Sequence, residues 1–156
     1  MKPALVVYFS IDGTTEKAGK RIAGLCGAED FRIEPDEAYS REDLDWTAAE
    51  ARCNIEMEDE GSRPAIKGKL PYVEGYGTII VGYPIWWGKA PRIIDTFLDS
   101  FDKSGHTILP FATSGGADVS QSVDELRRLY PDAKIGSGLR IRENTTDEEI
   151  RKWLAQ

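Results

Sequence analysis

Apolar residues along this chain gather into short, continuous runs separated by amphipathic stretches. The strongest runs are ALVVYF at 4–9, TIIVGYP at 78–84 and TILPFATS at 107–114. A run that is apolar throughout and rich in β-branched residues is typical of a strand buried on both faces. Two weaker strands are predicted near 30–34 and 133–141. Pro110 is unusual for a central strand, because proline cannot donate a backbone hydrogen bond.

The stretches between these strands have the periodicity of helices. In 14–26, Ala18, Ile22 and Leu25 share one helical face, while the basic side chains fall largely on another. Further helices are predicted at 47–59, 90–101, 118–130 and 145–155. The last begins with Thr-Thr followed by Glu-Glu, which is typical of a capping box. The alternation predicts one α/β domain over 1–156, a doubly wound, five-stranded parallel sheet with helices on both faces.

The chain is acidic, with a formal net charge of −7 and a pI near 4.8. This balance argues against nucleic acid as a partner and favours partner proteins with basic docking faces. One stretch concentrates the negative charge and is interpreted as a solvated helix end rather than a metal site: Glu56, Glu58, Asp59 and Glu60.

Cysteine usage and the N-terminal run indicate the compartment. Cys26 and Cys53 form no CxxC pair, and both are predicted to be packing thiols in a reducing environment. The first apolar run has only about seven apolar residues before polar turn chemistry begins, and no small-x-small cleavage pattern follows it, so we interpret it as a buried strand rather than a signal sequence. No stretch approaches the ~20 apolar residues of a transmembrane helix. We therefore expect a cytoplasmic protein that does not bind membranes.

In a doubly wound sheet, ligands bind beyond the carboxyl ends of the strands, so the turn after the first strand is a candidate site. It contains Ser10, Asp12, Gly13, Thr14 and Thr15. Free backbone amides, a glycine and small hydroxyl side chains at a helix N-terminus favour a phosphate. A plain helix cap is the alternative. Asp12 counts against the phosphate, because a carboxylate beside it is repulsive. Either its side chain points away or the phosphate lies on the far side of the turn.

The turn after the third strand contains Pro84, Ile85, Trp86, Trp87 and Gly88. Adjacent side chains in an extended segment point in opposite directions, so the two tryptophans are not expected to lie in the core together. Such a wall favours a flat aromatic ligand. The alternative is that one tryptophan packs on a helix and the other covers a loop.

The turn after the fourth strand is rich in glycine and hydroxyl groups. Paired glycines permit positive φ and expose backbone amides toward a ligand. The alternative is an ordinary turn capped by an aspartate. The candidate residues are Thr113, Ser114, Gly115, Gly116, Asp118 and Ser120.

The three turns together resemble those of the flavodoxin family. The motifs are Ser-x-x-Gly-x-Thr, Pro-x-Trp-Trp-Gly and Thr-Ser-Gly-Gly, in this order, and the segment 38–66 is similar to the corresponding region of bacterial flavodoxin-like proteins. The resemblance covers nearly the whole chain. It implies the strand order 2-1-3-4-5 and non-covalently bound FMN.

The resemblance also implies a role for each turn. The residues at 10–15 would hold the phosphate, with the backbone of Asp12 included, and those at 84–88 would line one side of the flavin ring. Those at 113–116, with Asp118 and Ser120, would lie near the ring edge and the ribityl chain. The chain departs from the family at Asp12, where threonine is usual, and at Thr14, where asparagine is common.

Two functions are consistent with this resemblance. The first is electron transfer between redox proteins at low potential, because a net charge of −7 and an aromatic wall disfavour the reduced flavin anion. The alternative is an NAD(P)H-dependent flavin reductase of quinones or similar small molecules. A flavin-free receiver domain is disfavoured, since it needs a carboxylate cluster after the first strand and a phospho-acceptor aspartate after the third.

Overall fold

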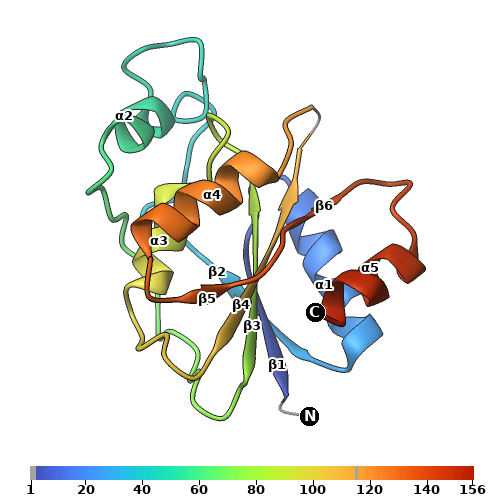
Figure 1. Cartoon of the computed structure of the whole chain (residues 1–156). Coiled ribbons are helices and arrows are strands. Elements are labelled where there is room, and N and C mark those ends of the chain that lie inside the picture. The colour runs from blue at the N-terminus through green and yellow to red at the C-terminus, as the bar shows by residue number, and fades with distance from the viewer. Residues whose placement is uncertain (1–2, 115) are drawn as a thin grey trace.

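A parallel sheet forms the centre of the computed structural model, which describes residues 3–114 and 116–156 (Figure 1). Its strands are β1 (Ala4–Phe9), β2 (Glu29–Ile33), β3 (Thr78–Pro84), β4 (Thr107–Thr113), β5 (Lys134–Ile135) and β6 (Leu139–Ile141). The order is β2-β1-β3-β4-β5, and β6 also pairs with β4. The predicted doubly wound fold and strand order are confirmed.

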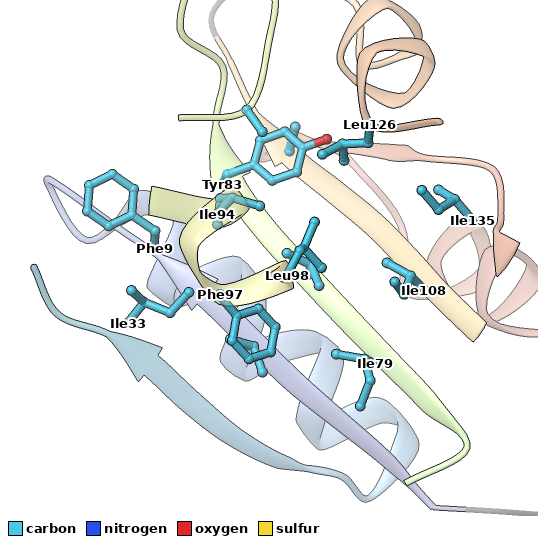
Figure 2. Close-up of a cluster of buried hydrophobic side chains, with 14 of the residues drawn as sticks. Phe9, Ile33, Ile79, Tyr83, Ile94, Phe97, Leu98, Ile108, Leu126 and Ile135 are labelled. Carbon is cyan, nitrogen blue, oxygen red and sulfur yellow. The ribbon is translucent and has the colours of Figure 1, made fainter. Parts of the chain in front are cut away.

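Helices cover both faces of this sheet. They are α1 (Thr14–Cys26), α2 (Arg52–Glu58), α3 (Arg92–Leu98), α4 (Ser120–Leu129) and α5 (Asp147–Leu154). Because side chains alternate along a strand, Val7 and Phe9 of β1 pack toward α3 and α4, while Val6 and Tyr8 pack toward α1 and α5. Figure 2 shows the first of these two clusters, with Phe97 of α3 among the labelled side chains.

Gly82 of β3 makes room for an aromatic ring on the α1 and α5 face. A Cβ atom at this position would lie 1.9 Å from the Phe111 side chain of the neighbouring strand. Phe111 is fully buried and lies edge-on to Trp153 of α5, with ring centroids 6.5 Å apart. The missing side chain at 82 therefore lets this ring lie flat on the sheet.

The predicted fifth strand is two short strands, so the prediction of five strands was wrong. The Gly136 amide donates to the carbonyl of Ile108, after which the chain leaves β4 and returns at Leu139. Residues two apart in a strand bond toward the same side, so Pro110 faces this gap. The missing amide of the proline therefore falls where β4 has no partner.

The segment 34–76 contains only one short helix. Its part around α2 lies toward the carboxyl ends of the strands, and the remainder runs past α3 to the start of β3 (Figure 1). The helix predicted at 47–59 begins only at Arg52, because the preceding residues form turns. The Asn54 side chain donates to the carbonyls of Trp46 and Ala48 and fixes these turns. Glu56 is buried and accepts hydrogen bonds from Tyr39 and Arg52. The interpretation of the whole acidic run as solvated was wrong at this residue.

Two further expectations concern cysteines and membranes. Cys53 is buried, but Cys26 is exposed, so only one of the two thiols packs in the interior. Within 3–114 and 116–156, none of the helices has the length and apolar character needed to cross a bilayer.

Candidate ligand-binding site

The first turn forms a cradle of backbone amides at the start of α1. Gly13, with φ of 93°, occupies the cap position of this helix and offers no side-chain cap. The Gly13 amide donates to Ser10 Oγ at 3.2 Å, and the Thr14 amide donates to Asp12 Oδ1 at 3.0 Å. The turn is thus not a plain threonine cap. The Gly13 and Thr14 amides instead donate to side chains of the turn itself.

Asp12 occupies the place expected of an anion. Its hydrogen bond from the Thr14 amide lowers the pKa of the carboxyl group, so the side chain stays ionised at neutral pH. Asp12 is among the residues that line the cavity described below, and how its carboxylate would lie relative to a bound phosphate stays a prediction. A phosphate would therefore have to displace this carboxylate from the Thr14 amide.

The first and third turns are joined by a buried hydrogen bond. Thr15 Oγ1 and Thr113 Oγ1 lie 2.7 Å apart, and both side chains are almost fully buried. The start of α1 and the end of β4 are therefore held together by two hydroxyl groups that the sequence predicts as ligand contacts.

The second turn is a tight hairpin. Trp86 and Lys89 exchange two backbone hydrogen bonds of 2.9 Å, and the residues between them, Trp87 and Gly88, have φ of 54° and 74°. Positive φ at both central positions is the requirement of a type I′ turn, in which asparagine and glycine are preferred. Trp87 adopts this strained conformation while its Nε1 donates to Asn54 Oδ1 at 2.8 Å.

The two adjacent tryptophans have different environments. Trp86 packs edge-on against Phe9 and Tyr39, with ring centroids 5.8 and 5.4 Å away. Trp87 is 47% exposed. A Cβ atom at Gly88 would lie 2.6 Å from the Gln121 side chain of α4, so this glycine permits close packing of the hairpin on that helix. One tryptophan therefore extends the core, and the other remains available at the surface.

The third turn is organised by Ser114. Its Oγ accepts from the amides of Ala117 at 2.7 Å and Gly116 at 3.2 Å, and its carbonyl accepts two hydrogen bonds from the Arg140 guanidinium. Gly115 lies outside the described residues. The amides of Gly116 and Ala117 are thus directed at the serine of their own turn.

Asp118 and Ser120 lie apart from the other predicted residues. The Asp118 carboxylate accepts from the Ser120 amide at the start of α4. Both line a separate hollow of about 300 Å³ with Arg127, on the side of α4 and Gly138. The structure does not bring these two side chains to the cavity between the three turns.

A cavity of about 750 Å³ lies between the three turns. Asp12 and Thr14 come from the first turn, residues 84–86 from the second, Thr113 and Ser114 from the third, and residues 140–144 from the end of β6. Its charged groups are Asp12, Glu143, Arg140 and Arg142. The negative and positive charges balance locally, although the whole chain is acidic.

Residues 140–144 were not predicted as part of the site. The residues before them have the pattern of one continuous strand at the edge of the sheet, and the three candidate turns follow other strands. The rule that ligands gather at strand carboxyl ends, applied to β6, is the signal that identifies them.

A sequence model described as flavodoxin matches residues 3–156. The chain belongs to the flavodoxin family. A provisionally assigned flavoprotein from Bacteroides eggerthii is 39% identical to this flavodoxin, covers 99% of this chain and 97% of its own, and has a TM-score of 0.93. A second one, from Bacteroides uniformis, is 40% identical over 99% of both chains, with a TM-score of 0.92.

A more distant structure carries a ligand. The flavoprotein from Lactobacillus acidophilus in complex with FMN is 22% identical to this flavodoxin over 99% of both chains, with a TM-score of 0.75. At this identity the likeness shows the fold alone. Among curated proteins, no match to the chain was found.

Proposed function

We propose that this flavodoxin binds FMN non-covalently in the cavity of about 750 Å³ and transfers electrons at low potential between partner proteins with basic docking faces. The observation that carries the proposal is the junction of an amide cradle with an aromatic hairpin in one cavity of a flavodoxin chain. FMN supplies the redox chemistry when bound, since it accepts and releases one or two electrons.

The residues present fit the cofactor. Thr14 lines the cavity at the N-terminus of α1, so its amide would form the anion-binding end, where the helix adds a favourable dipole. The Gly13 amide and the Ser10 hydroxyl bond to each other beside it and do not line the cavity. Pro84, Ile85 and Trp86 offer an apolar wall to a planar ring at the other end.

The charged side chains around the cavity modify the reduction potential expected for bound FMN. Net negative charge and an apolar wall disfavour the reduced anion, but Arg140 and Arg142 line the same cavity and favour it. Arg140 is also the residue that holds the Ser114 carbonyl. The low-potential proposal therefore depends on Asp12 and Glu143 offsetting these two guanidinium groups.

The first experiment is a visible absorption spectrum of the purified chain after addition of FMN and desalting. We expect two flavin bands that survive desalting and are shifted relative to free FMN. A colourless protein would overturn the proposal. A spectroelectrochemical titration against dyes of known potential then measures the low-potential part of the proposal.

Asp12→Asn tests the phosphate end. Removing the carboxylate charge should tighten FMN binding about tenfold, because the phosphate then meets no repulsion at the Thr14 amide. Riboflavin, which lacks the phosphate, is the matched ligand, and its affinity should not change. Fluorescence titration of both ligands measures this ratio. An equal effect on both would show that the phosphate does not bind at this turn.

One observation favours the second candidate function, a flavin reductase of small molecules. An apolar cavity of about 510 Å³ adjoins the proposed FMN cavity and shares Trp86 with it. Bleaching of the bound flavin by NADPH alone, without a partner protein, would support the reductase. Reduction that requires a second redox protein would support the electron carrier.

A further inference from the structure

The adjoining cavity is formed by three separate segments. The first turn contributes Ile11 and Asp12, and the second contributes residues 84–87. The segment 34–76 contributes Leu44, Trp46 and Cys53. Its volume of about 510 Å³ falls within the range of small-molecule sites, which is about 300–1,000 Å³. Asp12 and residues 84–86 line both cavities, so the two hollows are neighbours.

The walls of this second cavity are fixed by one buried side chain. Asn54 is 3% exposed, and it donates to the carbonyl of Trp46 and accepts from Trp87 Nε1. Through Asn54, the turn that carries Trp46 in the segment 34–76 is joined to Trp87 of the hairpin. Because the indole nitrogen of Trp87 already has its partner, this ring offers carbon surface to an occupant.

Two of the residues that line the cavity are tryptophans with unusually exposed side chains. Trp46 is 73% exposed and Trp87 is 47% exposed, although tryptophan gains free energy by leaving water. Asp12 is the one charged residue among those lining it. Its carboxylate disfavours an anion, while the indole rings favour a flat aromatic molecule.

We propose that this cavity is a binding site for an uncharged, planar aromatic molecule of two or three fused rings, next to the FMN cavity. The proposal names the substrate class of the reductase candidate and rests on the proposed function only for the position of FMN beside it. Binding itself requires the protein alone. The ring of FMN and a side chain of a partner protein are the competing occupants.

The test is calorimetric titration of the FMN-free and the FMN-loaded protein with two redox-inert probes of the same shape, 2-naphthol and 2-naphthoate. We expect 2-naphthol to bind both forms with one site and equal affinity, and 2-naphthoate to bind at least tenfold more weakly. Asp12→Asn should reduce this difference between the probes. Equal affinities for both probes in the unmodified protein would overturn the charge argument.

Trp46→Ala locates the site, because this side chain is highly exposed and is not needed to fill the core. We expect about tenfold weaker 2-naphthol binding, as loss of an aromatic wall predicts. Tyr72→Ala is the matched control, since Tyr72 is 75% exposed, lies before β3 and does not line the cavity. Equal loss in both variants, or no loss in either, would overturn the proposal.

Competition with FMN distinguishes between the possible occupants of this cavity. If FMN displaces 2-naphthol, the cavity holds the flavin ring and the proposal is wrong. If neither form binds 2-naphthol, the exposed indoles serve something other than a small aromatic molecule, such as a partner protein. If the protein fails to retain FMN, the proposed function fails, while titration of the FMN-free form still decides this inference.

Discussion

The sheet with its four covering helices and the segment 34–76 are stabilised in different ways. In the sheet, apolar side chains of alternating strand positions fill two continuous clusters. The segment also packs apolar side chains, among them Val73 and Ile66, against the first cluster, but buried polar groups hold the part around α2. Arg92 of α3 donates to the carbonyls of Glu56 and Met57 at the end of α2, and Asn54 joins the turns at 46–48 to Trp87.

Because they are stabilised differently, the two regions should respond differently to substitution. Apolar burial is non-directional and is distributed over many neighbours, so its loss weakens the whole domain. A buried hydrogen bond or ion pair is directional, and removing one partner leaves the other without compensation. The segment should therefore fail locally and at specific residues, while the sheet should fail cooperatively.

The largest expected effect is in the sheet. Phe111→Ala should lower the free energy of unfolding by about 3–5 kcal/mol, because it opens a cavity in a fully buried cluster. Urea denaturation measures it. Adding Gly82→Ala should cost less in this background than in the unmodified protein, since the new Cβ enters space that the ring has left. Simple additivity of the two substitutions would contradict this account.

Arg92→Met tests a buried guanidinium that donates to the segment and also pairs with Asp95 of α3, inside the covered sheet. Arg92 is 2% exposed and its Nη1 lies 3.7 Å from Asp95 Oδ2, which is itself buried. Removing the guanidinium leaves this carboxylate without its nearest cation, and we expect a loss of about 3 kcal/mol in urea denaturation. Adding Asp95→Asn should recover part of it. A double variant no more stable than Arg92→Met would show that the pair is not coupled.

Asp95 also gives the protein a pH dependence. Burial raises the pKa of its carboxyl group to about 6, although Arg63 and Arg92 oppose the shift. Between pH ~4 and ~6 the folded chain binds more protons than the unfolded chain, so this group lowers stability as pH rises, by up to about 3 kcal/mol. The stability of the protein relative to Asp95→Asn should fall over this window and level off above it. A flat difference would refute the assignment.

The smallest effect is expected at Asn54. Asn54→Ala removes two hydrogen bonds within the segment and one between the segment and the hairpin, which together should cost about 2 kcal/mol. The loss should appear as faster proteolysis near 46–48 and altered tryptophan fluorescence, with little change in the urea midpoint. Asn144→Ala, at an exposed position, is the control. A large shift of the midpoint would show that the segment unfolds with the sheet.

Sequence patterns predict the first region well and the second poorly. The bounds of α1, β1 and β3 agree with the apolar periodicity, because these elements bury whole faces. In contrast, nothing local in NIEMED indicates that Asn54 reaches a tryptophan 33 positions away or that Glu56 is buried. Such contacts depend on tertiary placement, which periodicity does not encode.

The candidate site likewise has features that the sequence predicts and features that it does not. Topology places the three turns at one edge, so Thr14, Trp86 and Ser114 meet in one cavity as the sequence suggests. The positive φ of Trp87 and the participation of Arg140 were not predictable, because one depends on a specific hairpin and the other on the split of the last strand. Whether these residues bind FMN stays a prediction.

The split of the last strand has a consequence for self-association. An exposed strand edge offers its free amides and carbonyls to another chain and can seed aggregation. Here β5 and β6 are two and three residues long with a break between them, so this edge offers no long ladder. At the opposite edge, β2 places Glu29, Asp30 and Arg32 in solvent. An incoming strand therefore meets a broken edge on one side of the sheet and charged side chains on the other.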